Sequence, residues 1–314
     1  MLAIVGERGA GKSRLLQRIR DGHPLSTLVE CPVDGIEGLR ATLAVALGLD
    51  PAASIQDCAV AAESRGDDSA ILIDHANRLV LPVMGGLDGF DKFAGIARRH
   101  SERTTWILVF NEVIWQFFER SRGAYPVFDE VVRIEPWREE EIIALLRARS
   151  AQVHMEPSFE AVIDRPIRDG DSIDREEAVS RVARGYFRML WDYADGNPGV
   201  ALDVWRRQLG AGLDGKVFVR PFQVPDVREL ERLSDEDVFV VRAIIQLEPA
   251  AVDDVVKAST RSQGRVLDLL RYGTARGWFE PVGDRYRVSW NWYRPVTRFL
   301  QRRHLLASFH RFGG

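Results

Sequence analysis

A glycine-rich octapeptide near the start of the chain constrains the fold more than any other feature of the sequence. Residues 6–13 read GERGAGKS, which fits the pattern G-x-x-x-x-G-K-[ST] of a phosphate-binding loop. The apolar run 2–5 precedes this loop, and the helical stretch 14–19 follows it. Its glycines let backbone N–H groups point inward around a polyphosphate, and the following helix adds the positive end of its dipole. The sequence therefore predicts a site for ATP or GTP.

Individual residues of the phosphate-binding loop have predicted roles. We expect Lys12 to reach the β- and γ-phosphates and the Ser13 hydroxyl to ligate Mg²⁺. The predicted nucleotide contacts in the loop are Gly6, Gly9, Ala10, Gly11, Lys12, Ser13 and Arg14. A glycine turn without a ligand is the alternative, and the strand before and helix after disfavour it. The sequence lacks an Asn-Lys-x-Asp guanine motif, which favours ATP over GTP.

Composition narrows the class of protein. The 314 residues allow more than one domain, because single domains usually hold about 100–200 residues. No apolar run approaches the roughly 18 residues of a membrane span. Two cysteines and no signal-like start favour a cytoplasmic protein without a disulfide framework or zinc site. The net charge of −3 gives no global reason to expect nucleic acid. Since the first strand begins at Met1, a fragment or shortened version is one interpretation of the chain.

Hydrophobic patterning predicts an α/β fold with a parallel sheet for the first part of the chain. Short β-branched runs alternate there with longer helical patterns. Strands are expected near 2–5, 27–31, 69–74, 105–110 and 128–134, with helices near 12–21, 36–48, 54–65, 86–100 and 111–120. Ligands bind at the carboxyl ends of such strands, where the phosphate-binding loop, Asp74 and Asn111 would converge.

The remainder of the chain predicts two further domains. Helices are expected at 138–149, 175–195 and 198–209, with an exposed loop at 164–174, a flexible connector at 210–215 and a short strand at 216–219. Next come predicted helices at 234–247, 251–259 and 262–276, a hairpin at 278–289 and a final helix at 295–309. Three helices and a hairpin describe a winged helix. We therefore expect an ATPase core at 1–137, a helical lid at 138–212 and a winged-helix domain at 213–314.

Two strand ends carry candidate catalytic groups. Asp74 follows the apolar run 71–73, as expected for a carboxylate that holds Mg²⁺ through water at a strand tip. Asn111 ends the strand predicted at 105–110. Two interpretations of Asn111 remain open: it orients water or contacts the γ-phosphate, or it caps the helix that follows.

Taken together, these motifs resemble those of AAA+ ATPases. The resemblance adds the segments 132–137 (VRIEPW) and 195–202 (DGNPGVAL) to the loop, Asp74 and Asn111. It is closest to the origin-recognition-like group and to the signal-transduction ATPases called STAND. In those families a helical lid and a winged helix follow the ATPase core, so the resemblance covers nearly the whole chain.

The resemblance implies further site residues. Pro198 would pack near the adenine or phosphates and let the lid sense the nucleotide. Relatives often place an arginine there, whereas this chain has Pro198-Gly199, which favours the STAND interpretation. Hydrolysing relatives commonly carry a glutamate where this chain has His75, which is a less assured base and implies slow turnover. A gating or structural role for His75 is the alternative.

An arginine finger would be expected after Asn111 and before the fifth strand. Arg120 and Arg122 are the available residues, and surface charges at a helix end are the alternative interpretation. If Arg122 acts on a neighbouring subunit, ATP would bridge subunits and control assembly.

The predicted winged helix has two possible roles. As a reader of duplex DNA it would use the helix and wing arginines, and the aromatic residues beyond the hairpin could stack on bases. The candidate residues are Arg261, Gln263, Arg265, Arg271, Arg276, Arg285 and Arg287, with the aromatic residues Trp290, Trp292, Tyr293 and Phe299. The aromatic residues could instead fill a core or face a partner domain. As in STAND relatives, the winged helix could alternatively clamp an ADP-bound form, which we favour.

The sequence therefore predicts a cytoplasmic ATPase that uses ATP and Mg²⁺ and hydrolyses ATP slowly. Its nucleotide state would control domain arrangement or assembly, with self-association or a partner protein as the output. The alternative function is a DNA-binding AAA+ ATPase of the initiator or transposition-helper kind.

Overall fold

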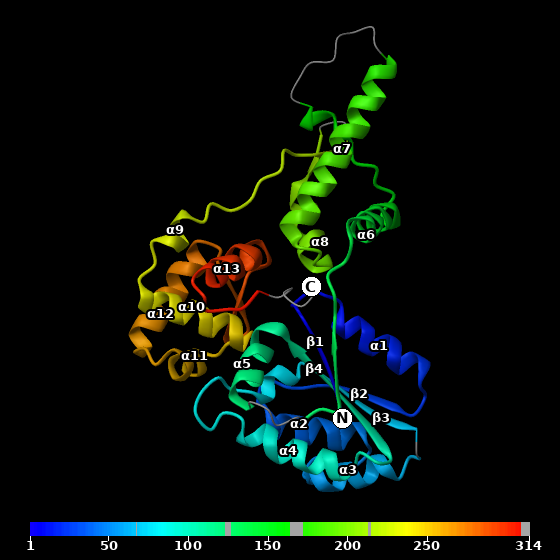
Figure 1. The fold of residues 1–314 in the computed structure, drawn as a ribbon, viewed down its shortest axis with the longest axis vertical. Helices are drawn as coiled ribbons and strands as arrows, with labels where there is room; N and C mark the ends of the chain where they lie inside the picture. Colours follow the sequence, from blue (N-terminus) through cyan, green and yellow to red (C-terminus); the bar gives the residue numbers. More distant parts are fainter. Residues whose placement is uncertain (67, 123–126, 164–171, 213–214, 309–314) are drawn as a thin grey trace. The chain divides into compact units, whose positions relative to one another are not determined.

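The structure is a computed structural model that describes residues 1–66, 68–122, 127–163, 172–212 and 215–308 (Figure 1). The chain forms two compact units. The first unit contains residues 1–135, 232–289 and 298–314, and the second contains residues 136–231 and 290–297. Among the helices that the structure describes, none is long and apolar enough to span a membrane.

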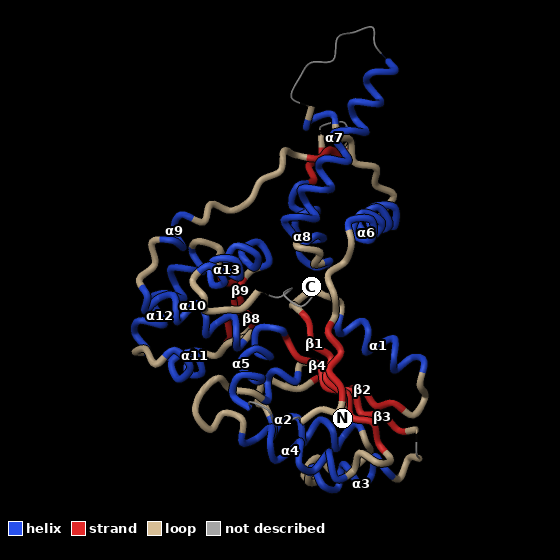
Figure 2. Tube along the Cα trace, viewed as in Figure 1, coloured by secondary structure: helices blue, strands red, loops and turns tan. Residues whose placement is uncertain are grey.

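A five-stranded parallel sheet forms the centre of the first unit (Figure 2). Its strands are β1 (Leu2–Gly6), β2 (Ser26–Glu30), β3 (Ser69–Asp74), β4 (Thr104–Asn111) and β5 (Glu130–Arg133), in the order β2-β3-β4-β1-β5. In register, Gly6 pairs with Asn111 and Glu30 pairs with Asp74. The predicted α/β fold with a parallel sheet is thus confirmed, and the register brings these four strand ends, three of them with polar side chains, to one edge.

Helices cover both faces of this sheet because the strand side chains alternate between two apolar clusters. Along β1, Ala3 and Val5 belong to one cluster and Ile4 to the other, and β3 and β4 alternate in the same way. The helices are α1 (Lys12–Gly22), α2 (Ile36–Ala46), α3 (Ile55–Glu63), the 3₁₀ turn η1 (Ala76–Leu79), α4 (Asp88–Arg99) and α5 (Glu112–Arg122). The cluster with Ile4 includes Leu16 of α1, whereas α2, α3, α4 and α5 contribute to the other.

Residues 232–289 of the first unit form what we call the helix–hairpin module. It consists of α10 (Asp235–Leu247), α11 (Val252–Ser259), α12 (Gln263–Ala275) and the antiparallel pair β8 (Phe279–Val282) and β9 (Arg285–Val288). Ser234 and Ser262 cap α10 and α12 by accepting backbone N–H bonds, which starts each helix where the sequence predicted. The left-handed Gly283 (φ 62°) lies between the two strands.

The second unit is mainly helical. It contains α6 (Glu139–Gln152), η2 (Glu160–Val162), α7 (Ser172–Ala194), α8 (Pro198–Gln208), β6 (Leu209–Ala211), β7 (Val217–Val219) and α9 (Arg228–Glu231). Residues 164–171 of the loop predicted at 164–174 lie outside the described residues, and α7 already begins at Ser172. The connector predicted at 210–215 was partly wrong, because β6 and β7 pair antiparallel from Leu209 onward.

The last helix begins five residues earlier than predicted. We used Pro295 as a helix start, yet α13 runs from Trp290 to Arg302 with Pro295 inside it. Buried side chains at positions 292, 293, 296, 299 and 300 follow a helical spacing that continues through the proline. Base stacking by Trp292, Tyr293 or Phe299 is excluded in this structure, because all three are buried. The amphipathic pattern therefore predicts the start of α13 correctly, whereas Pro295 does not.

Candidate nucleotide site

A cavity of about 560 Å³ lies at the carboxyl ends of the central strands in the first unit. Such a volume is ordinary for small-molecule sites, which span roughly 300–1,000 Å³. Its lining from the sheet and loop includes Arg8, Gly9, Gly11, Lys12, Ser13, Arg14, Glu30, Asp74, His75, Asn77, Arg78, Val109 and Asn111. The predicted residues Lys12, Ser13, Arg14, Asp74, His75 and Asn111 therefore meet in one place.

The phosphate-binding loop has the backbone that its glycines permit. Gly9 (φ 88°) and Gly11 (φ 100°) both lie in the left-handed region, where a side chain would introduce strain. A tight turn follows, in which the Ala10 amide donates to the carbonyl of Glu7 (3.2 Å). Gly11 precedes α1, so the loop amides and the helix N-terminus can act together on an anion.

The side chain of Lys12 folds back toward the first residues of the phosphate-binding loop. Its ammonium donates to the carbonyls of Gly6 (2.7 Å) and Glu7 (2.6 Å). Burial lowers the pKa of Lys12 from its ordinary value to about 8, although Asp74, Glu7 and Glu112 oppose the shift. A half-buried cation of this kind favours an anionic partner, and a phosphate would stabilise its charged form.

The Asp74 side chain is buried and lines the cavity. It ends β3, and its Oδ1 accepts the backbone N–H of His75 (2.8 Å), which fixes the carboxyl group. Ser13 lines the same cavity. Within the described part of the chain, no group of three or more His, Cys, Asp or Glu side chains could hold a metal. One hydroxyl and one carboxylate still fit Mg²⁺, which prefers oxygen ligands and completes its shell with water and phosphate oxygens.

His75 has a constrained backbone next to Asp74. Its φ of 55° is left-handed, a region that few residues other than glycine occupy. The ring atom Nε2 lies 3.9 Å from both Asp74 Oδ2 and Glu30 Oε1. Burial lowers the pKa of His75, although the carboxylate of Asp74 opposes the shift. The imidazole is therefore neutral near pH 7, as a proton acceptor requires.

Asn111 carries an unsatisfied acceptor at the end of β4. Its Oδ1 is buried and accepts no hydrogen bond from any described residue. An N-cap would accept a backbone N–H of the following helix, so the capping interpretation does not hold in this structure. Because buried polar atoms usually have partners, an orphaned amide oxygen that lines a cavity indicates a site for water or ligand.

Sequence reasoning missed several lining residues. Glu30 ends β2 as Asp74 ends β3, so the strand-end rule could have found it. Arg78 donates to Glu30 Oε1 (3.1 Å) and holds that carboxylate at the cavity. The helix–hairpin module contributes Glu248, Pro249, Val282 and Arg287 to the lining. No local signal marks these four, because they lie more than 230 residues beyond the loop in sequence.

A direct contact joins the loop to the module. Arg8 Nη1 donates to the carbonyl of Val288 (2.6 Å) and to both oxygens of Glu248 (3.2 and 3.3 Å). Glu248 is buried and also accepts the Val288 amide (2.8 Å). Burial raises the pKa of Glu248, which Arg8 opposes. The module therefore contacts the loop through a charged pair that is shielded from water.

Four predicted site residues are not among the lining residues of this cavity: Gly6 and Ala10 of the loop, Arg122 and Pro198. Arg122 forms an ion pair with Asp91 and stacks on the rings of Phe90 and Phe118, so within this chain it fixes α5 against α4. Its role toward a neighbouring subunit stays a prediction. Pro198 belongs to the second unit, where it occupies the first turn of α8 after the Asn197 cap.

A structural reason explains the Asp-Gly-Asn-Pro segment around Pro198. Asn197 Oδ1 accepts the amides of Gly199 (3.0 Å) and Val200 (3.1 Å), which starts α8. The backbone at Gly196 passes close to Pro136, and a Cβ at this position would lie only 2.6 Å from Pro136 Cβ. Glycine avoids this clash because it has no side chain. This packing lies within the second unit and leaves a nucleotide role for Pro198 as a prediction.

Most arginines proposed as DNA contacts are engaged within the module. Arg265 binds Asp237 (2.6 and 2.7 Å), and Arg261 lies 3.4 Å from Glu236. On the hairpin, Arg287 donates to Glu280 (2.5 Å) and lines the cavity. DNA phosphates would have to compete with these carboxylates, which weakens the electrostatic case for duplex binding.

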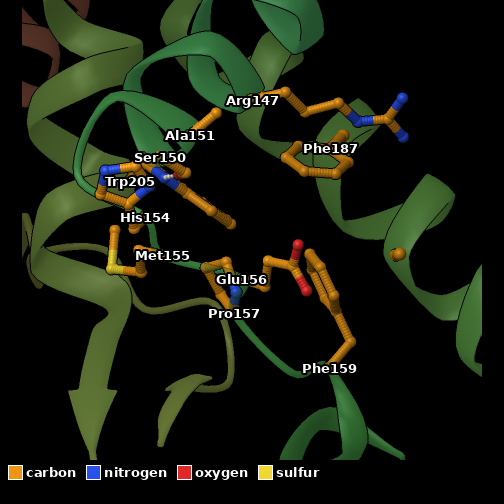
Figure 3. Close-up of a pocket in the computed structure, with 11 residues that line it drawn as sticks. Arg147, Ser150, Ala151, His154, Met155, Glu156, Pro157, Phe159, Phe187 and Trp205 are labelled. Atoms are coloured by element: carbon orange, nitrogen blue, oxygen red, sulfur yellow. Dashed lines mark hydrogen bonds between the residues drawn. The ribbon is translucent and has the colours of Figure 1, made fainter.

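A second cavity, of about 680 Å³, lies in the second unit between α6, α7, α8 and the segment after α6 (Figure 3). Three aromatic side chains, Phe159, Phe187 and Trp205, form part of its walls. The Trp205 indole N–H donates to Ser150 Oγ (3.2 Å), and the Arg147 guanidinium lies 5.8 Å from the Phe187 ring. No glycine-rich loop or helix N-terminus faces this cavity among its lining residues.

Comparison with known proteins shows the fold. No protein-family model and no curated protein matches the sequence. The ORC2 protein of Aeropyrum pernix, solved as ADPNP–ADP complexes, is 13% identical and aligns over 98% of this chain and 89% of its own, with a TM-score of 0.51. The Walker-type ATPase paby2304 of Pyrococcus abyssi is 18% identical over 95% of this chain and 91% of its own, with a TM-score of 0.42. The likeness to ORC2 shows that this chain shares the overall fold of that protein.

Proposed function

We propose that this chain binds ATP with Mg²⁺ in the cavity of the first unit and hydrolyses it slowly. One observation supports the proposal above all: the phosphate-binding loop, Asp74 and Asn111 come from three neighbouring strands and line a single cavity. A half-buried cation, a buried carboxylate and an orphaned amide oxygen together match the needs of a triphosphate, its metal and a water molecule.

The residues divide the chemistry among them. Lys12 and the loop amides stabilise charge on the phosphates, and Ser13 and Asp74 hold Mg²⁺, which neutralises phosphate charge when bound. Asn111 Oδ1 accepts a hydrogen bond from the attacking water and orients it. His75 stands where hydrolysing relatives carry a glutamate, and a neutral imidazole is the weaker activator, so we expect slow turnover.

The output of the cycle is a change in domain arrangement or assembly. The helix–hairpin module, which corresponds to the predicted winged helix, lines the same cavity as the loop. A nucleotide can therefore act on the module directly, provided that it binds two arrangements with different affinity. We further propose that the predicted lid around Pro198 responds to the nucleotide and that Arg122 serves assembly with a second copy or a partner protein in the cytoplasm.

The DNA-binding alternative has less support, because carboxylates of the module already bind its arginines. A salt titration separates the two functions. DNA loading predicts binding that weakens steeply with salt and is lost when Arg265, Arg271 and Arg285 are neutralised. Absence of duplex binding at low salt would leave the nucleotide switch as the function.

Calorimetry tests the proposed function directly. The purified chain is titrated with ATP, ADP and GTP at millimolar Mg²⁺, and phosphate release is followed in parallel. We expect saturable binding of the adenine nucleotides and slow, Mg²⁺-dependent release of phosphate. Light scattering with ADP and with a non-hydrolysable ATP analogue then measures assembly. If neither adenine nor guanine nucleotide binds, the proposal is wrong.

A further inference from the structure

The charged contact between Arg8 and the helix–hairpin module has no role in the chemistry described above. Arg8 is one of the four variable positions of the phosphate-binding loop, and it lines the cavity together with Gly9, Gly11 and Lys12. Its partner Glu248 follows directly after α10, and its second partner Val288 ends β9. A residue of the phosphate-binding loop thus binds the helix–hairpin module directly.

Glu248 is the centre of this contact. Its Oε1 accepts both the Arg8 guanidinium (3.2 Å) and the Val288 amide (2.8 Å), so one carboxylate ties α10, β9 and the loop together. Only about 9% of Glu248 is exposed. A buried carboxylate that loses its cationic partner keeps a charge that water cannot solvate. The Arg8–Glu248 pair therefore contributes to holding the module against the loop.

We propose that Arg8 is a phosphate-responsive latch: it holds the module through Glu248 and releases it when a triphosphate occupies the loop. The proposal rests on the proposed function, because it needs a nucleotide in this cavity. A triphosphate brings several negative charges to the loop, and these compete with the single carboxylate for the guanidinium. ATP brings one more phosphate group than ADP and should release the latch more strongly.

Thermodynamic linkage gives the latch a measurable consequence. If ATP weakens the Arg8–Glu248 contact, then removing that contact must tighten ATP binding by the same factor. We expect a factor of about 10, which is typical of coupling between two sites. Arg8 would thus discriminate between ATP and ADP through the module as well as through the phosphates.

A neighbouring carboxylate offers a matched control. Glu280 Oε1 lies 3.9 Å from Arg8 Nη2, but this side chain is 36% exposed and binds Arg287 instead (2.5 Å). Glu280→Gln removes the same charge as Glu248→Gln at a similar position near Arg8. A general electrostatic effect would change the affinity for ATP equally in the two variants. A latch predicts tighter ATP binding in Glu248→Gln only.

The test combines nucleotide affinity with amide hydrogen exchange over residues 246–250 and 285–288. In the wild-type chain, a non-hydrolysable ATP analogue with Mg²⁺ should speed exchange in these segments more than ADP does. Glu248→Gln should show fast exchange without nucleotide and bind the analogue about 10-fold more tightly, while Glu280→Gln should match the wild type. In Arg8→Ala, exchange should no longer respond to the analogue.

Each failure has its own signature. Absence of binding heat in every variant would overturn the proposed function. Normal binding with no change in exchange over residues 285–288 would overturn the latch alone, and so would equal affinities of Glu248→Gln and Glu280→Gln. Glu248→Gln keeps the size of the side chain and an acceptor for the Val288 amide, so it should fold where Glu248→Ala does not.

Discussion

Two of the cavities that the described residues form have similar size but different linings. The cavity of the first unit, at about 560 Å³, is built from strand ends and a glycine-rich loop, and charged side chains line it. The cavity of the second unit, at about 680 Å³, is built between helices and has three aromatic side chains in its walls (Figure 3). The larger of the two has no backbone cradle for an anion. Volume alone therefore does not mark the functional site; convergent backbone amides and buried charge do.

The largest expected effect separates the two cavities by mutation. Lys12→Ala removes the half-buried ammonium group from the first cavity and should weaken ATP binding by about 100-fold or more, because charged hydrogen bonds to phosphate are lost. Glu156→Gln changes a charge in the second cavity and should leave ATP affinity unchanged. Calorimetry measures both variants. Equal weakening by the two substitutions would show that the cavities are not functionally distinct.

Asp74 should separate binding from hydrolysis. Asp74→Asn keeps the shape of the side chain and removes the charge proposed to hold Mg²⁺, so phosphate release at saturating ATP should fall by about 50-fold. Chelating Mg²⁺ should weaken ATP binding to the wild type and have little effect on this variant. Phosphate release that stays normal in Asp74→Asn would remove the metal role from this residue.

The pKa of Lys12 predicts how affinity depends on pH. The free site loses the proton of Lys12 near pH 8, whereas bound phosphate favours the charged form and raises its pKa. The complex then holds more protons than the free protein above pH 8, so affinity must fall as pH rises. We expect about 10-fold weaker binding at pH 9 than at pH 7. Affinity that is flat across this range would place Lys12 away from the phosphates.

Asn111 should give the smallest effect. Asn111→Ala should lower turnover by about fivefold, since one hydrogen bond to the attacking water is lost. Its Oδ1 has no hydrogen-bond partner among the described residues, so thermal stability should change little. Turnover and melting temperature are measured together. A large loss of stability with unchanged turnover would indicate a structural residue.

The part of the first cavity that is built from local sequence signals could be predicted from the sequence. The strand predicted at 69–74 matches β3, and Lys12, Ser13 and Asp74 lie where the motif and the strand-end rule placed them. Glu248 and Arg287 could not be found in this way. Glu248 contacts the loop, and Arg287 lines the cavity, only through tertiary packing across 240 residues or more. Competing local signals explain the late start predicted for α13, where amphipathic spacing overrides Pro295.

The first unit is not continuous in sequence, because residues 136–231 of the second unit are made between its first two segments. Residues 1–135 emerge first and already contain the loop, Asp74 and Asn111, but residues 136–231 are made before Glu248 and Val288 appear. A nascent chain thus contains the phosphate-binding loop without the carboxylate that binds Arg8 while residues 136–247 are being made. During that time, nucleotide in the cell has access to the loop before the rest of the protein can compete for it.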